Sequence, residues 1–342
     1  MASAVSAGTQ QRERDPDHQV MKVATIVAPG RVMLHEQPLP DPERGQVRVA
    51  LHGCGVCASN LPVWQGRPWF EYPLPAGSPG HEGWGTIDAI GEGVDSLAVG
   101  DRVAMLSYHA FATHDLAPAD AVIKLPPNLE GPFPGEPLGC AMNVFERADV
   151  SPGHSVCIVG VGFLGALLIQ LARHRGAKVI AVARRSWACK LAENCGADQA
   201  VQMTSTGDTA QQIGSLTNGQ GCDRVFEVTG HQEPLDLAGQ LVRVRGKLII
   251  AGYHQDGLRQ VNLQQWNWNG IDVINAHERD PERYVHGIKQ AAEAVSQGYL
   301  KPQALYTHRY PLDHLAEALD MACQRPDSFV KALILMPGHE SC

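Results

Sequence analysis

The glycine-rich turn GVGFLG, from Gly160 to Gly165, constrains the fold of this chain more than any other segment. It follows the apolar run SVCIV, opens a stretch with apolar residues at helical spacing, and leads to a second apolar run, KVIAVA. Such a strand, turn, helix and strand form a βαβ unit, in which Gly160 permits the tight turn, Gly162 lets the backbone approach a pyrophosphate and Gly165 allows close helix packing. We therefore predict that this turn, with Phe163 and Leu164, binds a dinucleotide.

Apolar strands and helical segments continue to alternate after the turn, through CDRVFEVTG, PLDLAGQLVRVRGKLIIAGY and GIDVINAH. This alternation predicts an α/β fold with a doubly wound, mostly parallel Rossmann sheet. The chain before it instead alternates apolar and polar residues with Pro and Gly punctuation, which is typical of short antiparallel strands. We place a disordered tail at 1–20, a β-rich catalytic domain at 21–140 and 282–342, and the dinucleotide-binding domain at 141–281.

The amino-acid composition limits the classes of molecule that we expect this protein to bind. The 342 residues carry a net charge of −8, so nucleic acid and acidic membrane surfaces are not expected to bind. No run approaches the roughly 20 apolar residues of a membrane span, and the N-terminal residues lack a signal-peptide core. Nine cysteines without regular spacing are typical of reduced thiols. We expect a cytoplasmic protein that acts on a small molecule.

Four polar residues ahead of the turn are candidate metal ligands. Cys57 lies in GCGVCASN, His81 and Glu82 in PGHEGWG, and Glu136 in PGEPLGC. A thiolate, an imidazole and carboxylates are ligands that zinc accepts. From the residues alone, a structural role for each of them stays open.

The residues after the second strand of the βαβ unit bear on which dinucleotide binds. An NAD site usually carries Asp or Glu there, whereas a 2′-phosphate requires its absence and an arginine. Ala183 occupies that position, and Arg184 and Arg185 follow. The pattern favours NADP over NAD, although two solvated arginines would look the same.

Taken together, these motifs resemble the medium-chain dehydrogenases and reductases, a family that includes zinc alcohol, sorbitol and glucose dehydrogenases. The resemblance covers roughly Met21 to Pro337. It runs in order through the Cys57 segment, GHE at Gly80, GDRV at Gly100, EPL at Glu136, GVGFLG and CGAD at Cys195. The Glu-Pro-Leu segment is most similar to the polyol dehydrogenase branch. The resemblance implies a GroES-like fold for the β-rich domain.

The resemblance also implies roles for individual residues. Cys57 and His81 would be ligands of a catalytic zinc, Glu82 a movable ligand or neighbour, and Glu136 the third protein position of the site. Ser59 matches the hydroxyl that accepts the substrate proton. The remaining matches concern the cofactor. Lys331 stands where a basic residue contacts its phosphates, and Thr229, Gly252 and Ala276 lie at strand ends near its nicotinamide ring.

Three departures from the family matter. Asn60 stands where an aspartate is common, so the orientation of a metal ligand is in question. The four-cysteine lobe is missing after GDRV, so we expect one catalytic zinc and no structural zinc. Pro62 stands where a histidine often extends the proton path to solvent.

The predicted activity is hydride transfer between a secondary alcohol, such as a polyol, cyclitol or sugar, and NAD(P), with zinc as Lewis acid. One alternative is a zinc-free quinone or enone reductase of the same fold, and another is a dinucleotide-sensing protein without turnover. Aromatic residues in WQGRPWFEYP, including Trp64, are candidates for a substrate pocket. Family members pair their sheets through segments like GIDVINAH, so we expect a homodimer or homotetramer.

Overall fold

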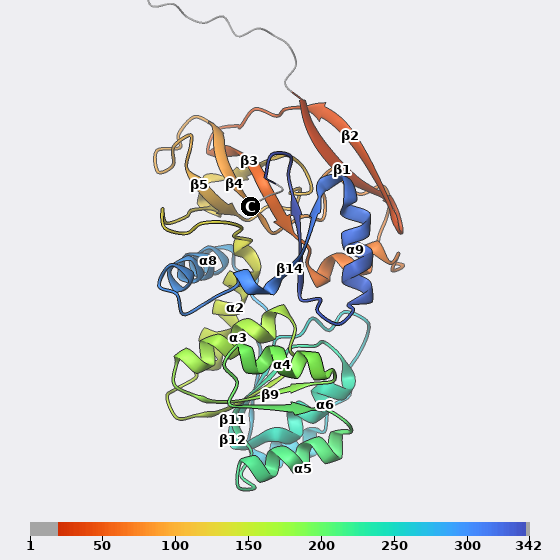
Figure 1. The fold of residues 1–342 in the computed structure, drawn as a ribbon, viewed down its shortest axis with the longest axis vertical. Helices are drawn as coiled ribbons and strands as arrows, with labels where there is room; N and C mark the ends of the chain where they lie inside the picture. The colour runs from red at the N-terminus through yellow and green to blue at the C-terminus, as the bar shows by residue number, and fades with distance from the viewer. Residues whose placement is uncertain (1–19, 340–342) are drawn as a thin grey trace, which may run out of the picture.

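The computed structural model describes residues 20–339, in which two parts lie end to end (Figure 1). The lower part in the figure holds the parallel sheet, and the upper part combines N-terminal strands with the C-terminal helix and strands. Almost all of the tail that we predicted at 1–20 lies outside the described residues, and Val20 already begins a strand. Within the described range, no helix has the length and apolarity needed to cross a membrane.

The first sheet is parallel throughout and has the order β10-β9-β8-β11-β12-β13. Alternate residues of β8 enter different cores: Val156 and Ile158 pack in one cluster, and Cys157 and Val159 in another. Both faces of the sheet are therefore covered, which confirms the predicted doubly wound fold. Its strands are β8 (Ser155–Val159), β9 (Lys178–Ala183), β10 (Gln199–Gln202), β11 (Cys222–Glu227), β12 (Val242–Ile250) and β13 (Asp272–Asn275).

Five helices accompany these strands. The first, α3, begins directly at the glycine turn, and the helix after β9 begins directly after Arg185. They are α3 (Phe163–His174), α4 (Ser186–Asn194), α5 (Thr206–Leu216), α6 (Gln232–Leu241) and α7 (Leu263–Asn269).

The second sheet is mixed and has the order β14-β15-β3-β4-β5-β7, with β6 also paired to β3. The C-terminal strand β15 pairs antiparallel with β3, with Leu333 opposite Gly55, so Lys331 comes close to the segment after β3. A separate hairpin, β1-β2, completes the β-rich part. The strands are β1 (Val20–Ala28), β2 (Arg31–Pro38), β3 (Gln46–Gly55), β4 (Gly83–Ile90), β5 (Arg102–Met105), β6 (His114–Pro118), β7 (Val122–Lys124), β14 (Tyr306–Pro311) and β15 (Lys331–Leu335).

Two helices lie between the sheets. Figure 1 places α2 and α8 at the junction of the two parts, and residues of both helices belong to the same core as β8 and α3. Because Glu136 lies in the first turn of α2, the junction brings this carboxylate beside the β-rich sheet. The helices outside the parallel sheet are α1 (Leu61–Trp64), α2 (Gly135–Ala148), α8 (Pro281–Ser296) and α9 (Leu315–Gln324).

Candidate active site

Three of the predicted metal ligands meet at one end of the β-rich sheet. Cys57 follows β3, and His81 and Glu82 precede β4. These strands are antiparallel neighbours, with Cys54 opposite Gly83, so the end of one lies beside the start of the other. The ligand atoms of the three residues all lie within 4.8 Å of one another, an arrangement that no other His, Cys, Asp or Glu group has among residues 20–339.

Backbone and amide groups orient the two main ligands. The His81 ring makes a 2.8 Å contact between Nδ1 and the Pro79 carbonyl oxygen. If Nδ1 donates its proton there, Nε2 is left free to bind a metal. The buried Asn60 amide donates to the same carbonyl oxygen at 3.1 Å and accepts from the Cys57 backbone N–H at 2.8 Å. Asn60 thus fixes both ligand segments, and a carboxylate could not make the donated bond.

The charges of the cluster suit a cation. Burial alone would lower the pKa of His81, but the negative groups Cys57, Glu136 and Glu82 raise it well above its ordinary value. Burial raises the pKa of Glu136. The Oε2 atom of Glu82 is buried and accepts no hydrogen bond, although it is ion-paired with the Lys331 ammonium group at 2.6 Å. A thiolate, an imidazole and a carboxylate within reach of one another match the donor set of zinc, so the residues present fit that ion.

The Glu82 carboxylate also pairs with a lysine from the C-terminal strand. Both of its oxygens lie 2.6 Å from the Nζ atom of Lys331, and the two side chains are 0% and 5% exposed. Gly55 leaves the room for this pair, because a Cβ atom there would overlap Glu82 Oε2 and lie 3.1 Å from Lys331 Cε. The residue that we predicted to contact cofactor phosphates therefore has its ammonium group on Glu82, one of the three candidate metal ligands.

The remaining predicted catalytic residues lie around this trio. Ser59 Oγ is 3.5 Å from His81 Nε2, at the side of the ring that faces away from the Pro79 carbonyl group. Glu136 lies outside the compact group of ligand atoms, and its Oε1 atom accepts a hydrogen bond from the Cys140 thiol at 3.1 Å. Cys140 lies one helical turn further along α2 and was not among the residues predicted to form the site.

The glycine turn has the geometry that we predicted for it. Gly160 has a φ of +112°, which side-chain-bearing residues rarely adopt, and Gly162 is the N-cap of α3. The ring of Phe163, the first residue of α3, stacks on Tyr306 with centroids 6.0 Å apart, and Lys331 Nζ lies 5.0 Å from its centroid. Phe163 therefore connects the glycine turn to the buried ion pair at the candidate metal ligands.

The two arginines after β9 have different surroundings. The guanidinium group of Arg185 donates to the carbonyl oxygens of Arg325 and Pro326 at 2.8 and 2.9 Å and lies 3.6 Å from Asp327. Among the described residues, the exposed Arg184 side chain has no such hydrogen bond or ion pair. Arg185 thus links the parallel sheet to the segment after α9, whereas Arg184 is open to a ligand.

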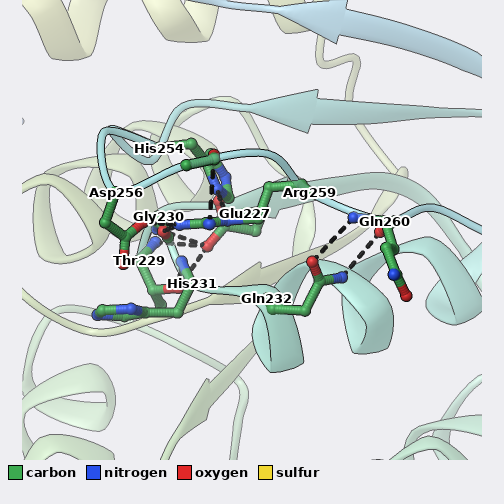
Figure 2. A network of polar contacts seen from close by, with 10 residues as sticks. Glu227, Thr229, Gly230, His231, Gln232, His254, Asp256, Arg259 and Gln260 are labelled. Carbon is green, nitrogen blue, oxygen red and sulfur yellow. Dashed lines mark hydrogen bonds and ion pairs between the residues drawn. The ribbon is translucent and has the colours of Figure 1, made fainter.

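Thr229, Gly252 and Ala276 lie just beyond the carboxyl ends of three adjacent strands, β11, β12 and β13. A dense polar network centred on the fully buried Glu227 includes Thr229 and His254 (Figure 2). The Gly252 backbone N–H also donates to the Glu227 carbonyl oxygen at 2.8 Å. Our reading of the sequence missed this network. The signal for it was an acidic residue at the end of the apolar run VFE.

Two aromatic residues, one predicted to line a substrate pocket and one not, have different surroundings. Trp64 is buried in the core, where its Nε1 atom donates to Asp320 at 2.8 Å, so its assignment to a substrate pocket is wrong. Tyr108 is 70% exposed and its ring centroid lies 6.3 Å from that of His81. Tyr108 is thus placed to meet a molecule that approaches the metal cluster.

Comparisons with known proteins agree with this geometry. The family model described as Alcohol dehydrogenase GroES-like domain matches residues 43–127, and the one described as Zinc-binding dehydrogenase matches residues 164–293. An alcohol dehydrogenase from Geobacillus stearothermophilus is 31% identical over 252 residues, which cover 64% of this chain and 73% of that protein. The erythritol/L-threitol dehydrogenase of Mycolicibacterium smegmatis is 26% identical over 362 residues, which cover 92% of this chain and 97% of that protein.

A solved structure extends the likeness to the whole fold. The crystal structure of a short chain alcohol dehydrogenase (rspB) from E. coli CFT073, complexed with NADH, has a TM-score of 0.83 and 23% identity, and covers 92% of this chain and 99% of that chain. The fold and the paired sites define a dehydrogenase that uses a nicotinamide cofactor. The chain belongs to the zinc-dependent medium-chain dehydrogenase family, so the family, the fold and the class of enzyme that we predicted are confirmed.

Proposed function

We propose that this enzyme oxidises a secondary alcohol of the polyol, cyclitol or sugar class with NADP as hydride acceptor, at one zinc ion held by Cys57, His81 and Glu82. The observation that carries the proposal is the compact group of three ligand atoms next to the dinucleotide turn. A sugar alcohol or related polyol is supported by relatives such as the erythritol/L-threitol dehydrogenase.

We assign the direct metal contacts to Cys57, His81 and Glu82 and an outer position to Glu136, because only the first three form the compact group. When bound, zinc would acidify a substrate hydroxyl and the nicotinamide would accept the hydride. Lys331 would hold the Glu82 carboxylate whenever that group is not on the metal, since the pair is buried and lies 2.6 Å apart.

Ser59 is the residue that we propose to accept the substrate proton. Its hydroxyl lies 3.5 Å from His81 Nε2, the ring nitrogen that the Pro79 contact leaves free. Pro62 is buried in the short helix that follows, so this position offers no side chain that could carry the proton onward. We therefore expect the proton to leave by a route that does not pass through this position.

The preference for NADP rests on Arg184. Its side chain is exposed and has no hydrogen bond or ion pair within the described part of the chain, so it is available to a 2′-phosphate. Arg185 is already bound to two carbonyl oxygens and near Asp327. We therefore assign the phosphate contact to Arg184 and a structural contact between the two parts of the molecule to Arg185.

We also propose a homodimer or homotetramer that pairs through β13. This strand ends the parallel sheet, and an edge strand with open backbone groups invites pairing with a second copy. Its Val273 is 38% exposed, and the preceding helix α7 presents Leu263 and Trp268 at 67% and 88% exposure.

A cytoplasmic location is supported by the cysteines within residues 20–339, which are all free thiols.

The two rivals make different predictions. A zinc-free reductase would have no use for a compact thiol, imidazole and carboxylate group, so the cluster disfavours it. A dinucleotide sensor would bind the cofactor and turn nothing over.

The test is a screen of polyols, cyclitols, sugars and simple secondary alcohols with NADP and NAD, with and without a metal chelator, read by the absorbance of the reduced nicotinamide. We expect turnover with NADP that the chelator abolishes and added zinc restores. Turnover that survives chelation would favour the zinc-free reductase, and cofactor binding without any turnover would favour the sensor.

A further inference from the structure

The network of Figure 2 centres on a fully buried carboxylate. Glu227 is the last residue of β11 and is 0% exposed. Its Oε1 atom accepts hydrogen bonds from the backbone N–H of Thr229 at 2.6 Å, the Thr229 hydroxyl at 2.5 Å and the backbone N–H of Gly230 at 3.0 Å. All three partners are donors, so the arrangement matches an ionised carboxylate, which is acceptor-only. The carboxylate therefore determines the path of the chain directly after the strand.

Two further side chains extend the network to the loop after β12. His254 Nε2 lies 2.8 Å from Glu227 Oε2, and Arg259 Nε donates to His254 Nδ1 at 2.9 Å. Arg259 also donates to the Gly230 carbonyl oxygen at 2.8 Å and pairs with Asp256. The chain Glu227, His254, Arg259 and back to Gly230 forms a closed ring of contacts between two loops.

The two loops are in direct contact at the backbone. A Cβ atom on Gly252 would lie 2.5 Å from Glu227 Oε2, and the backbone N–H groups of Ala251 and Gly252 donate to the Glu227 carbonyl oxygen at 2.8 Å. Thr229 in turn packs on the dinucleotide turn, since a Cβ atom on Gly160 would lie 2.6 Å from its Cγ2 atom. Glu227 thus holds Thr229 and Gly252 against each other and against the turn.

The network has no capacity left for proton transfer. Both ring nitrogens of His254 have a partner, one on the carboxylate and one on the guanidinium group, so the imidazole has no free lone pair for a substrate. The candidate metal ligands come from the other sheet, and neither Glu227 nor His254 belongs to their compact group. What it can do is hold backbone in place.

We infer that Glu227, His254 and Arg259 form a positioning relay that fixes the strand-end loops at the nicotinamide end of the cofactor site, so that the ring is held in the orientation for hydride transfer. The inference rests on the proposed cofactor site, because Thr229 and Gly252 are the residues that we assign to the ring. The relay residues act through these two backbone segments and touch neither substrate nor metal ligands.

The experiment separates the two ends of the cofactor. His254→Leu removes both contacts of the imidazole, and His254→Gln keeps a donor for the carboxylate. The control is Gln232→Leu, since the Gln232 side chain binds Gln260 and Asp236 and not Glu227. Binding of NADPH and of adenosine 2′,5′-bisphosphate, which lacks the nicotinamide, is measured for each variant by titration calorimetry.

We expect His254→Leu to weaken NADPH binding by roughly 10-fold, the effect of losing a hydrogen bond to a charged group, and to leave the bisphosphate unchanged. His254→Gln should recover most of that loss, and Gln232→Leu should behave like the wild type. Equal weakening of both ligands by His254→Leu, or no weakening of NADPH, would overturn the relay.

Two further measurements keep the test decisive. If His254→Leu does not fold, Arg259→Leu replaces it, because its loss removes the other contact of the same imidazole and leaves the Glu227 contact in place. A wild-type protein that binds neither NADPH nor NADH would refute the proposed cofactor site itself, whereas normal wild-type binding with insensitive variants refutes the relay alone.

Discussion

Replacing Lys331 by methionine removes the cation from the buried pair beside the metal cluster. The pair lies 2.6 Å apart with side chains 0% and 5% exposed, so the variant leaves the Glu82 charge in the interior without its partner. Breaking such a pair costs about 3–5 kcal/mol, because the remaining ion is neither solvated nor compensated. At about 2–4 °C per kcal/mol for a domain of this size, metal-free Lys331→Met should melt about 6–20 °C below the wild type.

The partner substitution tells whether the pair itself is responsible. Glu82→Gln in the Lys331→Met background removes the stranded charge, so the double variant should recover most of the lost melting temperature. Zinc should also reduce the loss, since a carboxylate that binds the ion no longer depends on lysine. The assay is calorimetric melting of chelated and zinc-loaded protein. Melting of metal-free Lys331→Met within about 2 °C of the wild type, or a double variant no more stable than the single one, would contradict this role of the pair.

Three other predictions concern single side chains. Asn60→Ala should lower zinc affinity about 10- to 100-fold in chelator competition, because it frees both ligand segments, and an unchanged affinity would exclude that role. Arg184→Gln should raise the KM for NADP about 10-fold or more and leave the KM for NAD unchanged. Arg185→Gln should affect the two cofactors equally. The reverse result would exchange the roles of the two arginines. Burial, with His339 and Arg102, lowers the pKa of His52 to about 4, so folding stability should fall as the pH drops from about 6.5 through 4. For this partly exposed ring we expect a loss of about 1–2 kcal/mol, which His52→Gln should remove. Parallel melting curves of the two proteins against pH would contradict this expectation.

The parallel sheet could be predicted because its determinants are local. Strand β8, the glycine turn and helix α3 are contiguous, and their apolar pattern and turn chemistry specify the βαβ unit without reference to distant residues. The approach of Cys57 to His81 could be predicted only through the family resemblance. It depends on the antiparallel pairing of β3 with β4, whose register the sequence pattern does not determine.

Contacts between distant residues could not be read from the pattern. Lys331 and Glu82 are 249 positions apart, and only the pairing of β15 with β3 brings them together. The lysine was therefore assigned to cofactor phosphates by its place in the motif. Trp64 was misread for a related reason, since its partner Asp320 is 256 positions away and an aromatic residue in a polar stretch suggests a surface role.

The sequence contains one signal from which part of the Glu227 network could have been predicted. An acidic residue at the end of an otherwise buried strand must find donors, because an unpaired buried carboxylate is costly. The sequence indicates that need but not the source of the donors, which here are Thr229, Gly230 and His254.

The central claim is that one zinc ion sits on Cys57, His81 and Glu82, and metal analysis of the purified protein tests it most directly. We predict close to one zinc per chain in the wild type, a large loss of bound zinc in Cys57→Ala and His81→Ala, and retained zinc in Cys140→Ala, whose thiol lies outside the ligand group. Far less than one zinc per chain in a wild-type enzyme that still reduces NADP would contradict the account.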